Sequence, residues 1–415
     1  MSTTKPFVIS KTLVVAAYEK VKKSKGAAGV DQQTLTQFAL HRQDNLYKIW
    51  NRMSSGNYFP PAVRAVPIPK KSGGERILGI PTVSDRIAQM VVKMTFEPLV
   101  EPHFHPDSYG YRPHKSALEA VGAVRQRCWY SDWVLEFDIK GLFDNIDHDL
   151  LMKAVQHHTD NKWVILYIKR WIKAPMQMPD GTCVARTKGV PQGGVISPVL
   201  SNLFMHYVFD VWMGKNCVGV QWCRYADDGV VHCKSETQAK YIKIMLQKRF
   251  AECLLELHPD KTKVIYCKDA LRTSSYPNTC FTFLGYDFRR RTVRNSQTGE
   301  LLLRFTPAVS KSALKSMHAD LRSFKIPRKT SQSLLEIAKF LNPIVRGWLE
   351  YYSSYTPSAL HSFKRHIDDT LTVWAKCKYK KLRSSPTRAG RFIKKIKSEN
   401  PELFSHWDYA RKRVA

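Results

Sequence analysis

The stretch that most restricts the fold is Trp222 to Cys233, which reads WCRYADDGVVHC. Apolar residues alternate with polar ones on both sides of a tight Asp-Asp-Gly corner, and this pattern predicts a β-hairpin. A solvated turn would account for the two carboxylates, because Asp-Gly is a common turn dipeptide. The hairpin is therefore expected from this stretch alone, whereas a role for Asp227 and Asp228 has to come from the rest of the chain.

The charge of the chain indicates a polyanionic partner. Its 415 residues include 66 Lys and Arg against 35 Asp and Glu, a formal net charge of +31, with a globular hydrophobic content of 43%. Such an excess repels itself unless a polyanion is near, so nucleic acid is the expected partner and an anionic membrane surface the alternative. No apolar run approaches the roughly 20 residues that span a bilayer, so no membrane partner is expected.

Nothing in the sequence directs the protein out of the cytoplasm. The N-terminal segment KTLVVAAYEKVKK predicts a short amphipathic helix and not a signal peptide. Nine cysteines without a Cys-x-x-Cys pair indicate free thiols in a reducing compartment and no zinc site.

The first two thirds of the chain alternate between strand and helix patterns. AVRAVPIPKK and ERILGIP flank a Ser-Gly-Gly turn at residues 72–74 and predict a hairpin, and a helix is expected near residues 85–100. Alternation continues to about Phe288. This order predicts an α+β domain around a mixed or antiparallel sheet.

After about Thr306 the pattern becomes helical and strongly basic. Ser310 and Thr356 are expected N-caps of two amphipathic helices, the second with Pro357 in its first position. Residues 311–397 contain 20 Lys and Arg against five Asp and Glu. Aromatic residues are interleaved with these charges, so we expect a second, helical domain that binds nucleic acid.

A further carboxylate can join the pair in the hairpin. In WVLEFDIKGLFDNIDHD, strand alternation places Glu136 and Asp138 on a polar face opposite an apolar one. Two-metal phosphoryl transfer uses a few carboxylates to hold two ions about 3.5–4 Å apart, and oxygen ligands suit Mg²⁺. Asp138, Asp227 and Asp228 would supply that set if the fold brings them together.

The order of the motifs resembles that of bacterial group II intron reverse transcriptases, also called maturases, of the type that lacks an endonuclease. The matching segments are GGERILGIPTVSDRIAQ, SYGYRPHKSALEAV, FDIKGLFDNIDHDLL, GVPQGGVISPVLSNLF, RYADD, LELHPDKTKVIYCKD, FTFLGYDF and FLNPIVRGWLEYYS. They cover about residues 20–410. The resemblance implies an α+β right-hand polymerase with fingers and palm on an antiparallel sheet, followed by an α-helical thumb.

The resemblance also implies a division into four segments. Residues 1–62 would form the N-terminal extension and the start of the fingers, and 63–300 the fingers and palm. Residues 301–383 would form the thumb or maturase domain, and 384–415 a short basic segment that binds DNA. Since only 32 residues follow the thumb and none is cysteine, no metal-bound nuclease domain and no cutting of the second DNA strand are expected. The loop at 23–31, KSKGAAGVD, either holds template against the fingers or is a flexible linker.

Site residues follow from the same resemblance. It implies that the catalytic residues, which also bind the two Mg²⁺ ions together with the backbone carbonyl of Ile139, are Asp138, Asp227 and Asp228. It implies that the dNTP-binding residues are Lys70 and Arg76 on the triphosphate, Phe143 below the deoxyribose, where it excludes a 2′-hydroxyl, and Gln192 in the nucleotide pocket. It implies that the template or primer contacts are Arg112 and Lys261. Gly229 stands where many relatives carry a bulky residue, and looser packing beside the metals is expected there.

The implied function is that of an RNA-directed DNA polymerase of a group II intron. It would extend a DNA primer on an RNA template with dNTPs, bind the intron RNA, assist its splicing and carry it into target DNA. A bacterial cytoplasmic location is expected, at the nucleoid when target DNA is bound, with a monomer favoured over a dimer. Two alternatives stay open, namely a domesticated reverse transcriptase of defence, repair or diversity generation, and a splicing cofactor without polymerase activity.

Overall fold

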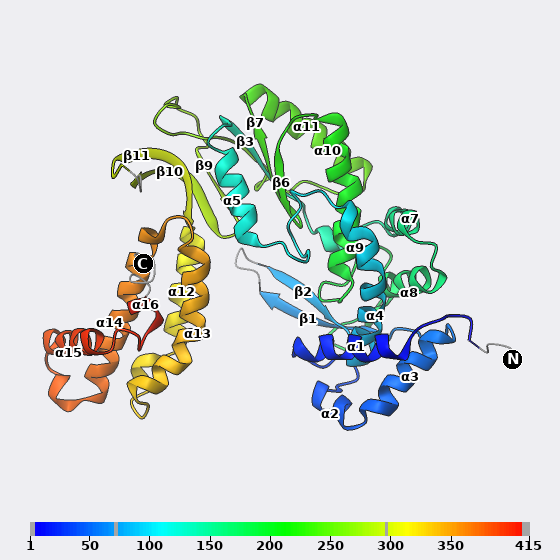
Figure 1. The fold of residues 1–415 in the computed structure, drawn as a ribbon, viewed down its shortest axis with the longest axis horizontal. Coiled ribbons are helices and arrows are strands. Elements are labelled where there is room, and N and C mark those ends of the chain that lie inside the picture. Colours follow the sequence, from blue (N-terminus) through cyan, green and yellow to red (C-terminus); the bar gives the residue numbers. More distant parts are fainter. Residues whose placement is uncertain (1–4, 70–73, 295–297, 409–415) are drawn as a thin grey trace. The chain divides into compact units, whose positions relative to one another are not determined.

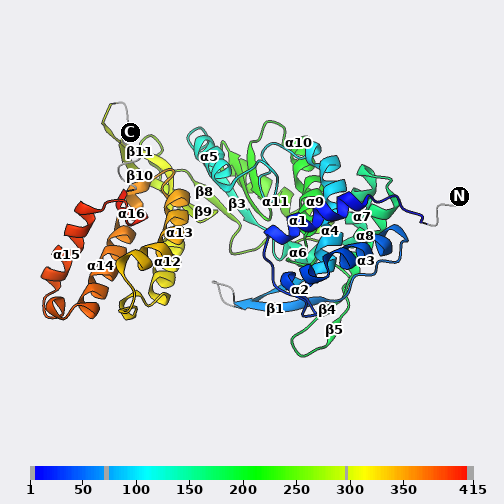
Figure 2. The same cartoon turned by 60° about the horizontal axis from the view of Figure 1, so that its bottom comes forward.

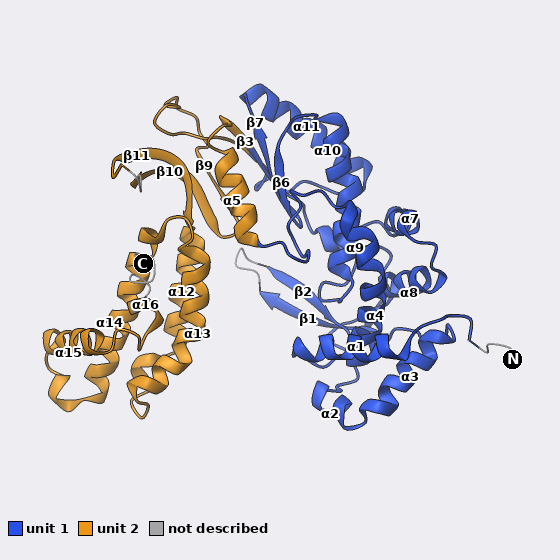
Figure 3. Ribbon diagram, in the orientation of Figure 1, with its two compact units in different colours: residues 1–116, 135–263 blue, residues 117–134, 264–415 orange. Residues whose placement is uncertain are grey.

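The computed structural model describes residues 5–69, 74–294 and 298–408, drawn in two views in Figure 1 and Figure 2. The chain forms two compact units (Figure 3). Unit 1 comprises residues 1–116 and 135–263, and unit 2 comprises residues 117–134 and 264–415.

Unit 1 begins with three helices, of which the first confirms the amphipathic helix expected from KTLVVAAYEKVKK. They are α1 (Lys11–Lys23), α2 (Leu35–Leu40) and α3 (Arg42–Ser54). The apolar face of α1 includes Val14 and Tyr18, both buried. It packs along α4 (Val83–Val100), the helix expected near 85–100, beside which it lies in both views (Figure 1, Figure 2).

The glycine-containing loop after α1 is packed against the start of α4. Arg86 Nη2 donates a hydrogen bond to the carbonyl of Ala27 at 2.7 Å. A β-carbon on Gly29 would lie 2.6 Å from the backbone of Thr82, so only glycine allows this approach. These contacts give the loop a defined position in place of the loose linker that the sequence left open.

The hairpin predicted around the turn at residues 72–74 is confirmed. β1 (Val63–Pro69) and β2 (Glu75–Ile80) pair antiparallel, with Ile68 opposite Arg76. β1 also pairs in parallel with β4 (Met176–Gln177), which pairs antiparallel with β5 (Cys183–Val184). The sheet order is therefore β2-β1-β4-β5, a mixed sheet. The turn at residues 70–73, including Lys70, lies outside the described residues.

A second four-stranded sheet carries the hairpin of Trp222 to Cys233. Its order is β6-β7-β3-β8, formed by β6 (Trp222–Tyr225), β7 (Asp228–Cys233), β3 (Trp133–Asp138) and β8 (Lys263–Tyr266). The predicted polar face of β3 is wrong, because Val134 is 0% and Asp138 only 7% exposed. β3 lies between two strands, and the Phe137 ring packs on those of Phe209 and Phe250. Asp138 is thus a buried acid at the end of an interior strand.

Helices connect and cover the strands of unit 1 (Figure 1). They are η1 (Glu101–His103), α6 (Leu142–Asn145), α7 (His148–His158), α8 (Lys162–Lys173), α9 (Ser197–Met205), α10 (Val211–Asn216) and α11 (Glu236–Glu252). The segment η2 (His206–Asp210), between α9 and α10, is a π-helix. α9 carries Pro198 in its first turn, where the missing N–H leaves no hydrogen bond broken.

Unit 2 combines a small sheet with a helical part. Its first helix is α5 (Ala117–Arg127), and its antiparallel sheet has the order β11-β10-β9, formed by β9 (Cys280–Phe283), β10 (Tyr286–Arg294) and β11 (Leu301–Val309). The helices that follow are α12 (Lys311–Ser323), η3 (Ile326–Arg328), α13 (Leu334–Tyr352), η4 (Pro357–Leu360), α14 (His361–Lys378), η5 (Lys380–Leu382), α15 (Pro386–Glu399) and α16 (Ser405–Asp408). The expected change to a helical part after about residue 306 is confirmed.

The two predicted N-caps have different outcomes. Ser310 caps α12, since its side chain accepts a hydrogen bond from the N–H of Ala313. Thr356 does not cap a helix, because its hydroxyl donates to the carbonyl of Pro307 in β11 and the chain first forms η4. The predicted stripe of α14 is buried all the same and contributes to the core of this unit, with Leu360, Phe363, Ile367, Leu371 and Trp374. Among the described residues, no helix has the length and apolar character needed to cross a membrane.

Candidate active site

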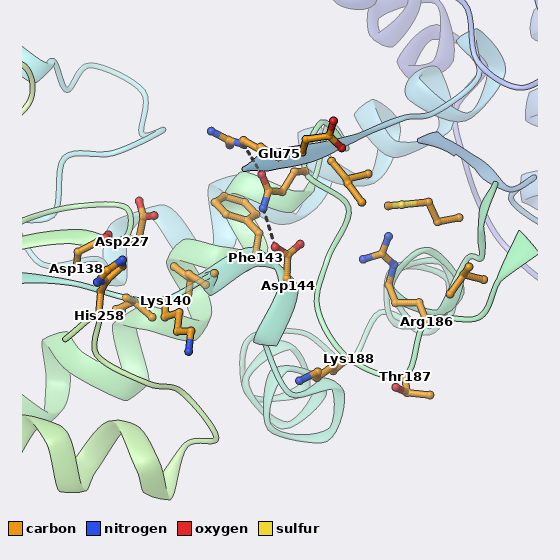
Figure 4. Close-up of a pocket in the computed structure, with 18 of the residues that line it drawn as sticks. Glu75, Asp138, Lys140, Phe143, Asp144, Arg186, Thr187, Lys188, Asp227 and His258 are labelled. Atoms are coloured by element: carbon orange, nitrogen blue, oxygen red, sulfur yellow. Dashed lines mark hydrogen bonds between the residues drawn. The ribbon is translucent and has the colours of Figure 1, made fainter. Parts of the chain in front are cut away.

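Three carboxylates meet where β3 and the β6–β7 hairpin lie side by side. Asp138 ends β3, Asp228 begins β7, and Asp227 lies in the turn between β6 and β7. Figure 4 shows Asp138 and Asp227 at the same end of one cavity. The backbone carbonyl of Asp138 accepts a hydrogen bond from the N–H of His258 at 2.8 Å, which fixes the end of β3. The fold therefore brings together the three acids that the sequence singled out.

The three acids affect one another strongly. Burial raises the pKa of Asp228 to about 8, and the negative charges of Asp227 and Asp138 add to the effect. Burial also raises the pKa of Asp227, again with a contribution from Asp138. The Lys261 ammonium lies 2.5 Å from Asp138 Oδ2 and compensates part of this charge. Burial lowers the pKa of Lys261, but its hydrogen bond to Asp138 and the negative charges of the three acids together raise it. Such a cluster is a natural site for added positive charge.

The chemistry of these donors fits divalent cations, although the described residues do not by themselves form a complete metal site. Carboxylate oxygens are the preferred ligands of Mg²⁺. Within the described ranges, however, no group of three or more His, Cys, Asp or Glu side chains is arranged to hold a metal ion. The cluster therefore offers oxygen donors and uncompensated negative charge, and a bound substrate would have to supply the remaining ligands.

The tight corner of the hairpin lies one residue earlier than its sequence suggests. Tyr225 pairs with Asp228, so the loop residues are Ala226 and Asp227. Gly229 belongs to β7, where an added β-carbon would lie 2.1 Å from the Phe137 ring. The prediction of loose packing at Gly229 is wrong, because Phe137 fills the space that a side chain would take.

Asp138 and Asp227 border a cavity of about 1260 Å³ that is also lined by residues of β2, β4 and β5. Phe143 lines it and is 8% exposed. Arg76 Nε donates to Gln192 Oε1 at 2.5 Å, and Gln192 Nε2 donates to Asp144 Oδ2 at 3.2 Å. Figure 4 shows Phe143 and Asp144 between the acids at one end and Arg186 and Lys188 at the other. Three of the four predicted dNTP contacts thus line one cavity, and the fourth, Lys70, lies outside the described residues.

The two predicted template contacts differ in their surroundings. Lys261 lines the cavity and has a side chain that is 57% exposed. The Arg112 side chain is 7% exposed, forms an ion pair with Glu101 at 2.8 Å and donates to the carbonyls of His105 and Ser108. Its guanidinium braces the 105–112 loop from within, so its geometry does not support contact with template.

Two polar residues of α4 hold the loop that carries Gln192, and sequence reasoning did not single them out. Gln89 Oε1 accepts hydrogen bonds from the N–H groups of Val195 and Ile196 at 2.8 and 3.4 Å. Gln89 Nε2 in turn donates to the buried Asp85 at 2.9 Å. Their four-residue spacing on one face of an apolar helix was the available signal. They fix Gln192 indirectly, through the backbone of its loop.

Comparison with known proteins agrees with this site. Residues 68–288 match the model of the family described as "Reverse transcriptase (RNA-dependent DNA polymerase)", and residues 314–392 match "Group II intron, maturase-specific domain". The chain is 33% identical over 317 residues to "Protein YkfC" of Escherichia coli, an alignment that covers 67% of this chain and 80% of that protein.

Two intron-encoded relatives match over shorter shares of their length. The "Group II intron-encoded protein LtrA" of Lactococcus lactis is 31% identical over 48% of this chain and 33% of its own length. The "Putative COX1/OXI3 intron 1 protein" of Saccharomyces cerevisiae is 28% identical over 60% of this chain and 29% of its own length. The matched region therefore spans about a third of these two relatives.

Proposed function

Because the chain belongs to the reverse transcriptase (RNA-dependent DNA polymerase) family and contains a group II intron maturase-specific domain, we propose that it extends a DNA primer on an RNA template. We further propose that it binds a group II intron RNA, assists its splicing and carries it into target DNA. The α+β arrangement with a helical C-terminal part is the right-hand polymerase fold of this family. Residues 63–300 would form fingers and palm, and 301–383 the thumb.

The observation that supports the proposal is that Asp138 and Asp227 line one end of a cavity that Phe143 also lines, and that Asp228 interacts electrostatically with both acids. A core or a solvated turn has no need of three neighbouring acids, one of which has its pKa raised to about 8 by burial and by the charges of the other two. A polymerase needs them, because its substrates bring in phosphate charge and cations together.

The residues of the chain would bind and orient the nucleotide. Phe143 would stack below the deoxyribose, and Gln192 would be held beside the sugar by Asp144. Arg76 and Lys70 would pair with the triphosphate, since guanidinium and ammonium groups both bind phosphate oxygens. The primer 3′-hydroxyl would then attack the α-phosphate in line with the departing pyrophosphate. Lys261, already beside Asp138, would contact a phosphate of primer or template.

Two Mg²⁺ ions would be held by the carboxylates of Asp138, Asp227 and Asp228 together with the backbone carbonyl of Ile139. When bound, they would lower the pKa of the primer hydroxyl and neutralise the charge of the triphosphate.

The proposed binding of intron RNA and target DNA follows from the positive charge of unit 2. The basic helices of unit 2 would bind intron RNA, and residues 384–415 would hold target DNA through its phosphates. A bacterial cytoplasmic location, at the nucleoid when DNA is bound, and a monomeric state belong to the same proposal. The main alternative is a splicing cofactor without polymerase activity, and the complete set of three acids favours the enzyme.

Primer extension on an RNA template by an Asp228→Asn variant tests the proposal. The substitution keeps the shape of the side chain but removes its charge, so extension should fall to less than about a hundredth of wild type. Asp149→Asn is the matched control, because Asp149 is an exposed acid in the first turn of α7, away from the cavity. Binding of the same RNA should be unchanged in both variants. Residual extension by Asp228→Asn above that limit would exclude the acid from the active site.

A further inference from the structure

The hairpin that carries Asp227 and Asp228 turns through a residue in a strained conformation. Ala226 is the first residue of the two-residue loop and has φ 58°, in the left-handed region. Glycine is the usual residue at this position of such a loop, because a β-carbon is crowded there. Strain of this kind persists only where the surrounding structure enforces it. Two neighbouring groups hold the Ala226 peptide, namely the Arg224 side chain and the segment 107–110.

Arg224, two residues earlier, provides one side of this support. Its side chain is 0% exposed. Its Nη1 donates to the carbonyl of Ala226 at 3.1 Å and to Asn202 Oδ1 at 3.4 Å. Its Nε and Nη2 donate to the two carboxylate oxygens of Asp210 at 2.8 and 2.7 Å, and Nη2 also donates to Ser108 Oγ at 2.9 Å. Every N–H of the guanidinium thus has an acceptor, and one acceptor belongs to the peptide that joins Ala226 to Asp227.

The segment 107–110 closes the other side of the turn. Arg224 N donates to the carbonyl of Asp107 at 3.0 Å, and the N–H of Tyr109 donates to the carbonyl of Arg224 at 2.9 Å. A β-carbon on Gly110 would lie 2.5 Å from the backbone nitrogen of Ala226, so only glycine lets this segment approach the turn. The loop before Asp227 is therefore enclosed between a buried guanidinium and a backbone.

Core stability alone does not account for the Asp210–Arg224 pair. Two buried charges lose hydration that their mutual attraction only partly offsets, and apolar residues often stabilise such a position as well. Asp210 moreover ends the π-helical segment η2, and such irregular segments occur frequently at functional sites. We propose that the Asp210–Arg224 pair is a positioning device, which holds the left-handed Ala226 peptide and thereby aims the carboxylates of Asp227 and Asp228. This inference rests on the proposed polymerase function and deepens it.

The variant that tests the pair is Arg224→Lys. Lysine keeps the positive charge for Asp210, but its single ammonium group cannot reach Asp210, Ser108 and the carbonyl of Ala226 at once. We expect kcat for primer extension to fall about a hundred-fold while KM for dNTP changes less than about three-fold, because misplacing catalytic groups by about 1 Å has effects of this size. A loss confined to KM would contradict the inference.

A second substitution separates positioning from a general loss of packing. Glycine at position 226 adopts the left-handed conformation without strain, so it needs less support from Arg224. The double variant with Arg224→Lys and Ala226→Gly should therefore recover at least about ten-fold in kcat over Arg224→Lys alone, a non-additive effect of residues that share one contact. If the two substitutions are simply additive, the positioning role is wrong.

The closing measurements do not depend on catalysis. Hydrogen exchange at the amides of residues 226–229 should be faster in Arg224→Lys without metal, and Mn²⁺, titrated by electron paramagnetic resonance, should bind about ten-fold more weakly. Both changes should be smaller in the double variant. Unchanged hydrogen exchange and unchanged Mn²⁺ binding in Arg224→Lys would overturn the inference. Because neither measurement needs polymerase activity, failure of the proposed function would be seen separately, as a lack of primer extension by wild type.

Arg272→Lys is the matched control. Arg272 also pairs with a buried acid, Asp269, and donates to the carbonyls of Cys128 and Ser131, but all four residues belong to unit 2. It should lower stability without changing kcat or the exchange of residues 226–229. Should Arg224→Lys fail to fold, Ser108→Ala removes a single acceptor of the same guanidinium, and its smaller loss in kcat should likewise be relieved by Ala226→Gly. An equal loss of kcat in Arg272→Lys, or no relief in the Ser108→Ala background, would contradict the inference.

Discussion

Phe143 is buried and at the same time lines the cavity. It is 8% exposed, which is typical of a core residue, yet it lines the cavity and meets the ring of Tyr111 edge-on at 6.2 Å. It also lies close to the acids in the chain, in the short helix α6 five residues after Asp138. This position agrees with the proposed contact between Phe143 and the deoxyribose.

Phe143→Ala should admit ribonucleotides. Removing the ring opens space where a 2′-hydroxyl would otherwise collide, so the ratio of kcat/KM for dNTP over rNTP should fall by roughly ten-fold or more. The ratio is measured on one template with matched nucleotides. Phe250→Leu, a core change in α11 outside the cavity, should leave the ratio as in wild type. An unchanged ratio in Phe143→Ala with normal dNTP activity would make Phe143 a packing residue only.

Among the elements, α4 connects Tyr58 and the helix α8 to the loop of Gln192. The Asp85 carboxylate accepts hydrogen bonds from Tyr58, Gln89 and Trp171. Gln89, held in this way, accepts hydrogen bonds from the backbone of residues 195 and 196. Because every neighbour donates, an acid is the fitting residue at this position. Burial nevertheless raises the pKa of Asp85 to about 6, despite the three donors.

Asp85 should make the stability of unit 1 depend on pH. Since its pKa is raised in the fold, the stability it contributes is complete below about pH 4 and is lost as pH rises through about 6. Asp85→Asn should flatten the stability profile between about pH 4 and 6, a change of roughly 3 kcal/mol for a shift of about two pKa units. Urea unfolding at several pH values measures it, with Asp149→Asn as control. A slope that survives Asp85→Asn would assign the pH dependence to another group.

The last helices of unit 2 are joined by one acid. Asp368 in α14 accepts hydrogen bonds from Lys397 of α15 at 3.0 Å and from Trp407 of α16 at 2.6 Å, and its Oδ1 lies 2.8 Å from His406 Nε2. Burial alone would raise the pKa of Asp368, but these partners lower it to about 2. A lowered carboxyl pKa stabilises the fold above the unfolded value near 4.

Asp368→Asn should destabilise unit 2 by about 1–3 kcal/mol at neutral pH, because buried donors lose a charged acceptor. In wild type the same contribution should disappear as pH falls from about 4 through about 2. Thermal unfolding of both forms measures the difference. Asp369→Asn, the exposed neighbour on α14, is the control and should change stability little. Equal stability of both variants would remove the joining role of Asp368.

For the whole molecule, the net charge of +31 governs affinity for nucleic acid. Cations that neutralise phosphates release counterions, so the affinity for RNA should fall linearly on a logarithmic plot against salt, by about 10³-fold or more between roughly 50 and 200 mM. Filter binding with wild type and Asp228→Asn should give the same slope, since the acids of the cavity do not carry this charge. A flat dependence would contradict electrostatic binding.

The sequence by itself determined the features that repeat over short distances. The hairpin of Trp222 to Cys233, the helix α4 and the buried stripe of α14 follow from periods of two and 3.6 residues, and Ser310 from the local chemistry of helix starts. The three acids were found from the order of motifs, although the polar face that the alternation predicted for β3 is buried.

Only the tertiary structure decided which distant residues meet. Asp138 and Lys261 are in contact although 123 positions separate them, Phe137 fills the space beside Gly229, and Thr356 bonds to β11 in place of capping a helix. Nothing in the motif RYADD indicated that Arg224 would be fully buried and paired with Asp210. Each of these contacts depends on packing between elements that are far apart in the chain. Such packing produces no periodic pattern in the sequence, because the residue that a side chain meets is set by the fold and not by adjacent residues in the chain.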